Sequence, residues 1–159
     1  MAADIFAKIG DIKGESLDAK HKDEVEVLSW SWGVSRAVGA TAGSGAGVGK
    51  ASFRDFVITH HIDKASPLLL KACATGEHIK EATITVRKAG SKAQQEYLIV
   101  KMSDVVVSNV DQSGADATTA ETVSLVFGKV EYEYKPQKID GSLDAGVFFK
   151  FDVKNSKVG

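Results

Sequence analysis

A glycine-rich segment that ends in Gly-Lys comes closest to a chemical motif. Residues 36–50 read RAVGATAGSGAGVGK. A phosphate-binding loop needs Gly, four residues, Gly-Lys and then a Ser or Thr that binds magnesium. Aligning Gly49 and Lys50 with this motif places Ser44 at the first glycine position and Ala51 at the hydroxyl position. A strand pattern follows, whereas a phosphate loop opens a helix. The sequence therefore argues against an enzyme with a phosphate-binding loop. A measurement of nucleotide binding would test this alternative.

The histidines and the single cysteine do not form a metal or nucleophile pattern. His60 and His61 are adjacent in a strand pattern, so their side chains are expected on opposite faces. His21 and His78 lie far from them in the sequence. Cys73 falls on the apolar stripe of a predicted helix, where a cysteine is usually a small buried hydrophobe. We therefore predict no metal, no cofactor and no enzymatic activity.

The strongest periodic signal lies in residues 25–34, VEVLSWSWGV. Period-two alternation is typical of a strand with one buried face. The alternation slips between Val27 and Leu28, where a bulge would keep Val25, Val27, Leu28, Trp30, Trp32 and Val34 on the core side. Both Trp rings are then buried together. Ser29 and Ser31 are expected on the opposite face.

The rest of the chain predicts strands around one helix. The expected strands span residues 4–9, 52–62, 78–88, 96–110, 122–134 and 147–153, with bulges near Ser103 and Gly128. The helix SPLLLKACATG has Ser66 as its N-cap, Pro67 in its first turn and Gly76 at its C-terminal end, with Leu69 and Leu70 on the apolar stripe. The pattern predicts a mainly β fold, a small closed or nearly closed β-barrel of two packed sheets with one short flanking α-helix.

Residues 1–159 are expected to form a single domain, with a flexible Gly/Ala-rich loop at about 36–50. A loop of this length is usually functional or disordered, and a neighbouring subunit could order it.

Composition excludes several classes of partner. Of the 159 residues, 43% are hydrophobic and 26% are charged, and the net charge of -1 gives no basis for nucleic acid or membrane binding. No apolar run reaches the roughly 20 residues of a membrane helix. The N-terminus MAADIFAKIGDIKGE predicts no Sec-type signal peptide, and one cysteine excludes an internal disulfide. These features predict folding in a reducing cytoplasm and leave later export open.

Three sequence blocks carry a family resemblance: DIFAKIGDIKGESLDAKHKDEVEVLSWSWG, then SPLLLKACATGEHI with TITVRKAG shortly after it, and VEYEYKPQKIDG. They resemble the haemolysin-coregulated proteins, the tube subunits of bacterial type VI secretion systems. The resemblance implies a β-barrel that forms hexameric rings, which stack head to tail into a hollow tube. It also implies a contractile sheath that expels the tube, a spike protein at its tip and effector proteins in its lumen. Export would then proceed without a Sec signal.

The resemblance also implies roles for particular residues. The glycine-rich segment matches an extended loop of the family that contacts a neighbouring ring or subunit, which would involve Gly43, Gly45, Gly47, Gly49 and Lys50. Ser31 falls at a position that faces the tube lumen in the family, in agreement with its predicted direction away from the Trp core. A monomeric barrel that carries a small hydrophobic ligand is the alternative, and it would require free space inside the barrel.

Overall fold

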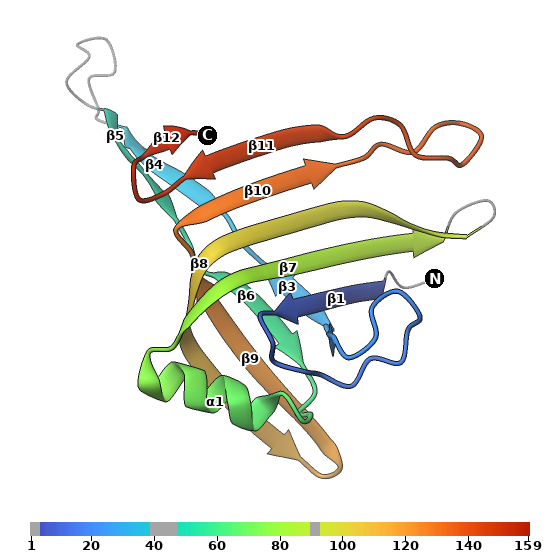
Figure 1. The fold of residues 1–159 in the computed structure, drawn as a ribbon, viewed down its shortest axis with the longest axis vertical. Helices are drawn as coiled ribbons and strands as arrows, with labels where there is room; N and C mark the ends of the chain where they lie inside the picture. The colour runs from blue at the N-terminus through green and yellow to red at the C-terminus, as the bar shows by residue number, and fades with distance from the viewer. Residues whose placement is uncertain (1–3, 39–47, 90–92) are drawn as a thin grey trace.

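A computed structural model describes residues 4–38, 48–89 and 93–159, drawn in Figure 1. The strands are β1 (Asp4–Ile9), β2 (Val25–Glu26), β3 (Ser29–Ser31), β4 (Val34–Val38), β5 (Val48–Phe53), β6 (Phe56–His60), β7 (His78–Ala89), β8 (Gln94–Ala115), β9 (Thr118–Val126), β10 (Lys129–Tyr134), β11 (Val147–Asp152) and β12 (Lys157–Val158). The helix α1 spans Ser66–Thr75. The prediction of a mainly β fold with one short helix is confirmed.

The sheet is organised around β8, which is 22 residues long. Its first half pairs with β7 and β10, and its second half pairs with β9. One path of paired strands runs β12-β11-β10-β8-β7-β1-β2, and a branch continues from β8 through β9 and β6 to β3. The two arms fold over a common core, so the barrel is nearly closed (Figure 1).

The predicted irregularities of β8 and its neighbour take a particular form. Asp104 has a left-handed φ of 55°, one residue after the predicted bulge at Ser103, and the register of β8 with β9 shifts later, between Val107 and Asn109. At Gly128 the chain turns a corner from β9 into β10, and the Gly128 N–H donates to the carbonyl of Ser103 at 2.9 Å. These bends let one long strand serve both arms of the sheet.

The slip between Val27 and Leu28 is a change of pairing partner. The Val27 N–H donates to the Ile5 carbonyl of β1 at 2.9 Å, and the Leu28 N–H donates to the Thr59 carbonyl of β6 at 2.8 Å. The chain thus passes from one arm of the sheet to the other. Leu28 lies at this corner and is 53% exposed, and Val34 is also exposed, so their prediction as core residues is wrong.

The helix is capped differently from the prediction. Ala65 is the N-cap residue and Ser66 is already helical, while the Asp63 carboxylate accepts a hydrogen bond from the Ala65 N–H at 2.8 Å. Gly76 ends the helix in the left-handed conformation, with φ of 67°, as predicted. Leu69 and Ala72 are buried, spaced three residues apart on one side of the helix, but Leu70 is exposed, so its prediction as part of the apolar stripe is wrong.

The core lies between the two arms and contains the predicted Trp cluster. Trp30 stacks on Phe56 with ring centroids 5.6 Å apart, and Trp32 contacts Phe53, Phe56, Phe127 and Tyr132. Both Trp side chains pack against the buried core, as the alternation predicts. Phe56, Ile58, Met102 and Leu125 fill the interior and are fully buried.

The glycine-rich segment departs most from the prediction. Its ends form an antiparallel ribbon in which β4 pairs with β5, and this ribbon projects from the barrel in Figure 1. The expected loop at 36–50 is therefore wrong at residues 36–38 and 48–50, which are strand. Small residues give no alternating apolar signal, yet their backbone groups pair readily across a ribbon. The predicted strand at 52–62 is likewise two strands, separated at Arg54 and Asp55.

Candidate assembly surfaces

Ser31 lies on an outward face that carries short polar side chains on β3, β6 and β9, and Asp111 of β8 continues the row of Thr122. The register aligns Ser29 with Thr59 and Thr122, and Ser31 with Val57 and Ser124. Ser29 and Ser31 are exposed, and the hydroxyl oxygens of Thr59 and Thr122 are 3.4 Å apart. We call Ser29, Ser31, Thr59 and Thr122 the hydroxyl face; Ser124 is aligned with Ser31 through Val57 but is itself buried. The predicted direction of Ser31, away from the Trp rings, is therefore correct.

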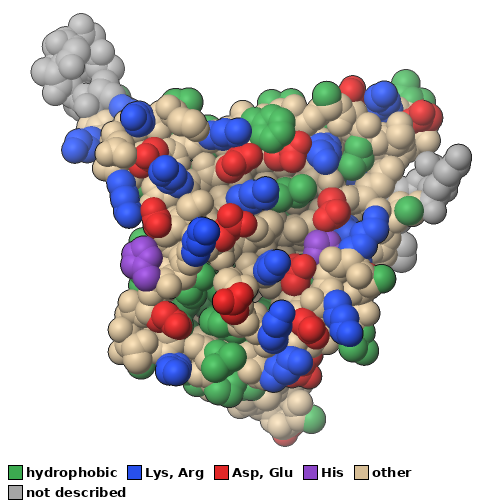
Figure 2. All heavy atoms as spheres, viewed as in Figure 1, with side chains coloured by type: hydrophobic (Ala, Val, Ile, Leu, Met, Phe, Trp, Pro, Cys, Tyr) green, Lys and Arg blue, Asp and Glu red, His purple; other side chains and the backbone are tan. Residues whose placement is uncertain are grey.

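The opposite arm of the sheet carries a charged face. One row across the strands contains Lys8, Thr83, Lys101, Glu131 and Lys150 in register. Glu131 and Lys150 form an ion pair at 3.7 Å. Figure 2 shows acidic and basic side chains interspersed over this side of the molecule. The two arms thus present surfaces of different chemistry.

The edge of the charged arm exposes apolar side chains. On β11, Val147 is 65% exposed, Phe148 is 54% exposed and Phe149 is 37% exposed, and neighbouring Tyr134 is also exposed. β12 pairs only with Phe151 and Asp152, so no strand in the described part of the chain covers the outer side of Val147, Phe148 or Phe149. We call these three residues the β11 edge. Uncovered apolar strand edges favour pairing with another chain.

The β4–β5 ribbon is attached to the same region through aromatic packing. The Phe53 ring lies 5.1 Å from Phe151 and 6.5 Å from Phe149, measured between centroids. Within the ribbon, Arg36 Nη1 donates to the Gly49 carbonyl at 2.9 Å. Gly49 and Lys50 belong to β5, whereas Gly43, Gly45 and Gly47 lie outside the described residues. The proposed contact role of these five residues remains a prediction.

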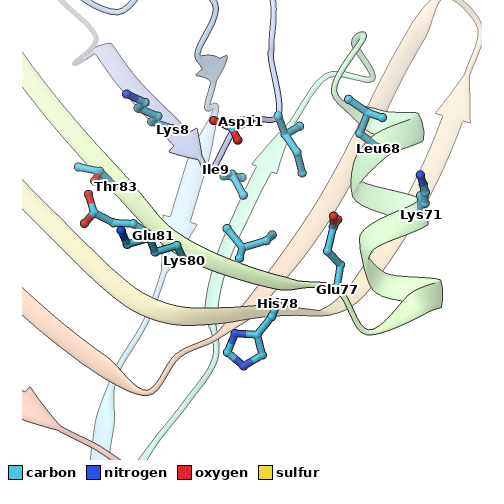
Figure 3. Close-up of a pocket in the computed structure, with 13 residues that line it drawn as sticks. Lys8, Ile9, Asp11, Leu68, Lys71, Glu77, His78, Lys80, Glu81 and Thr83 are labelled. Carbon is cyan, nitrogen blue, oxygen red and sulfur yellow. The ribbon is translucent and has the colours of Figure 1, made fainter.

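A surface groove of about 640 Å³ lies beside α1, drawn in Figure 3. Basic and acidic side chains line it, including Lys8, Asp11, Lys71 and Glu77, together with Leu68. The groove is therefore outside the barrel, whose interior is filled by the Trp and Phe cluster. This arrangement does not favour a carrier of a small hydrophobic ligand.

A buried polar cluster, which the sequence pattern did not reveal, lies near the start of α1. His60 Nε2 is 2.8 Å from Glu121 Oε1, and both residues are fully buried. Gln112 donates to the other oxygen of Glu121. Burial raises the pKa of the nearby Asp63 carboxyl, which lies 3.7 Å from His60 Nδ1. Its partners come from separate strands and a loop, so no local motif could have predicted it.

The remaining candidates for chemistry are dispersed. His61 is exposed, and its Nδ1 lies 2.7 Å from the Thr119 carbonyl. Within residues 4–38, 48–89 and 93–159, no three His, Cys, Asp or Glu side chains form a group that could hold a metal ion. Cys73 is a half-buried free thiol on α1. After Lys50 the chain continues in β5, not in a helix as a phosphate loop requires.

In the described part of the chain, no helix is long and apolar enough to cross a membrane, since α1 has 10 residues.

A nearly closed β-barrel with distinct outward faces and an open apolar edge defines a class of small β proteins built for surface contacts. Comparison with known proteins narrows this class. The profile of the family described as "Type VI secretion system effector, Hcp" matches residues 6–134. The chain therefore belongs to the Hcp family of the type VI secretion system, which is a family of secretion proteins and not a known enzyme family.

Relatives span almost the whole chain. Protein hcp1 of Pseudomonas aeruginosa is 46% identical over 148 residues, covering 92% of this chain and 91% of the relative. The crystal structure of Hcp1 from Salmonella typhimurium has a TM-score of 0.78 at 38% identity, with 99% of both chains covered. A type VI secretion system effector from Yersinia pestis has a TM-score of 0.77 at 38% identity, covering 94% of this chain and 100% of the other. The predicted resemblance is confirmed.

Proposed function

We propose that this protein is the structural subunit of a type VI secretion tube. Six copies form a ring, rings stack head to tail, and the hollow tube is expelled by a sheath behind a spike protein. The protein is made in the cytoplasm and leaves the cell through this system. It acts as an assembling part and a carrier, with no catalytic role, no nucleic acid partner and no insertion into membranes.

The β11 edge is the observation that carries this proposal. Val147, Phe148 and Phe149 offer apolar side chains and backbone groups without a strand beside them. A monomer would leave this edge in water and at risk of indiscriminate pairing. A ring of identical copies covers such an edge on each subunit by a heterologous contact that closes on itself.

The β4–β5 ribbon suits contacts beyond one subunit. It projects from the barrel, and Val34 and Val38 on it are exposed. Phe53 anchors its base against Phe149 and Phe151, beside the β11 edge. We assign the ribbon, with its residues Gly49 and Lys50, to contacts with a neighbouring subunit or ring, and we extend this assignment from the sequence to Gly43, Gly45 and Gly47.

The hydroxyl face is the proposed lumen surface. Ser31 is central to it, and short hydroxyl side chains present hydrogen-bonding groups without a fixed charge. Such a surface contacts effector proteins of differing charge without repelling them. The charged face would repel some of these effector proteins and bind others too strongly, depending on their charge.

We expect Val147→Glu to weaken assembly. A carboxylate placed on the β11 edge would be desolvated without a partner, which should weaken the contact by more than about tenfold. Size-exclusion chromatography with light scattering, at equal micromolar concentrations, measures the effect. Leu17→Glu is the matched control, because Leu17 is exposed in the loop between β1 and β2, and β7, β8 and β10 separate β1 from β11 in the sheet. Equal assembly of both variants and the wild type would remove the β11 edge from the interface.

We expect Ser31→Gln to leave the fold and the ring intact and to change effector binding. An exposed residue of a sheet face costs within about 0.5 kcal/mol when substituted. Thermal unfolding by circular dichroism and chromatography test stability and assembly, and co-purification of effectors tests the lumen surface. Trp30→Gln, one residue away on the core side, is the control that should destabilise. A melting temperature of Ser31→Gln as low as that of Trp30→Gln would contradict the assigned facing.

A further inference from the structure

The loop at residues 10–24, between β1 and β2, is a compact unit. The Gly14 N–H donates to the Asp23 carbonyl at 2.7 Å, the Ser16 N–H donates to the Glu24 carbonyl at 3.0 Å, and the Asp23 N–H donates to the Ser16 carbonyl at 2.9 Å. Two side chains of the loop, Asp18 and His21, then reach polar partners on the barrel. These two contacts differ in how they respond to pH.

The first contact is an ion pair between Asp18 and Arg87 of β7. Arg87 Nη2 donates to Asp18 Oδ1 at 2.7 Å, and Nη1 donates to Oδ2 at 3.0 Å. The Arg87 guanidinium also reaches Asp4 of β1 at 3.2 Å. Its hydrogen bonds to Asp18 hold the pKa of that carboxyl below its usual value. This contact is therefore fully present near neutral pH and is lost only in strong acid, as Asp18 is protonated.

The second contact places a buried histidine between two carboxylates. The His21 ring stacks on Phe6 with centroids 4.5 Å apart and an interplanar angle of 9°. Its Nδ1 lies 2.9 Å from Glu24 Oε2, and its Nε2 lies 3.1 Å from Glu96 Oε1 on β8. An ionised carboxylate accepts hydrogen bonds but does not donate them. Only the imidazolium, with an N–H at both nitrogens, satisfies both contacts. A neutral ring would point one lone pair at a carboxylate oxygen.

The charges around His21 favour the same state. Glu24 and Glu96 face it directly, and the Asp18 carboxylate accepts from its backbone N–H at 3.2 Å. Asp4 lies beyond, and Arg87 is the facing cation, positioned over the Phe6 ring. Lys20 and Lys22 flank His21 in the loop, and both are exposed and screened by water. Four carboxylates thus face a single close cation, Arg87, and a second proton on His21 adds another positive charge to this group.

We propose that His21 is a proton-dependent latch that joins Glu24 to Glu96 and holds the loop at 10–24 on the barrel. The latch is closed while the imidazole carries two protons. As pH rises and one proton leaves, one of the two hydrogen bonds is lost and the loop loosens, while the Asp18–Arg87 pair still tethers it. The latch depends on contacts within one chain and operates whether or not the chain forms rings.

The protonation state of His21 can be read directly. The chain contains four histidines, so imidazole nitrogen resonances of the full protein labelled at histidine can be assigned by His21→Gln. At pH 5.5 both His21 nitrogens should carry protons. In Glu96→Gln, which replaces one of the two carboxylate acceptors, the fraction of His21 that carries both protons at pH 5.5 should be lower than in the wild type. Glu77→Gln, at an exposed position after α1, should leave it unchanged. A neutral ring with a single N–H at pH 5.5 would overturn the proposal.

Hydrogen exchange measures the loop itself. After correction for intrinsic exchange, protection of the Gly14, Ser16 and Asp23 amides should fall about tenfold between pH 5.5 and pH 8, the equivalent of one charge-assisted hydrogen bond. His21→Gln should show the low protection at both values, while amides of the buried strand β6 stay protected in both proteins. Protection in the wild type that does not change with pH would also overturn the latch.

Discussion

Replacing Glu121 with alanine is expected to lower the free energy of unfolding by about 3–5 kcal/mol, because it leaves a buried partner unpaired. Glu121 and His60 are fully buried, and their side chains meet at 2.8 Å between β9 and β6. The substitution also removes the acceptor of Gln112. Chemical denaturation at pH 7 measures the loss. Glu77→Ala, at an exposed position, is the control and should change stability by less than about 0.5 kcal/mol.

A double substitution at His60 and Glu121 distinguishes the cost of leaving one buried partner unpaired from the cost of replacing the polar pair itself. His60→Leu combined with Glu121→Leu removes both polar groups and keeps apolar volume at both positions. Such replacements of buried pairs are often neutral or stabilising, so the double variant should recover much of the loss. A single Glu121→Ala variant as stable as the wild type would mean that the pair is open to water, contrary to its burial here.

Replacing Phe56 with alanine is the second change with a large expected effect. Its ring is fully buried between the two Trp residues, 5.6 Å from Trp30 and 5.9 Å from Trp32 between centroids. Deleting a buried Phe ring usually costs about 3–5 kcal/mol, through lost apolar burial and the cavity left behind. Thermal and chemical unfolding of the full chain measure it.

Phe148→Ala gives a matched comparison for Phe56→Ala within the same protein. Phe148 lies on the β11 edge and is half-exposed, so its loss should cost about 1 kcal/mol or less in the dissociated chain. The same variant should weaken assembly. A Phe56→Ala loss below about 1 kcal/mol would contradict the packing of the Trp cluster.

The direction of side chains along a strand was predictable from sequence, because alternation has a period of two. Trp30 and Trp32 face the core, and Ser29 and Ser31 face outward, as that period requires. The helix and its Gly76 terminus were predictable for a similarly local reason. The mainly β class followed from the sum of these signals.

Features that depend on distant partners were not predictable. His60 and Glu121 are 61 residues apart, and neither residue type nor spacing indicates that they meet. Leu28 was assigned to the core because the alternation does not show where the chain stops pairing with β1 and starts pairing with β6. The β4–β5 ribbon was missed because pairing of Gly, Ala and Ser residues is a property of the backbone. The candidate surfaces likewise became visible only when the strands were placed in register.

The central claim is that this chain forms rings. Size-exclusion chromatography with light scattering, followed by negative-stain images of the peak, tests it most directly. The account predicts a species of six times the 16.9 kDa mass of the chain, seen as a ring with an open centre. A single monomeric peak across micromolar concentrations, with no rings in the images, would contradict it.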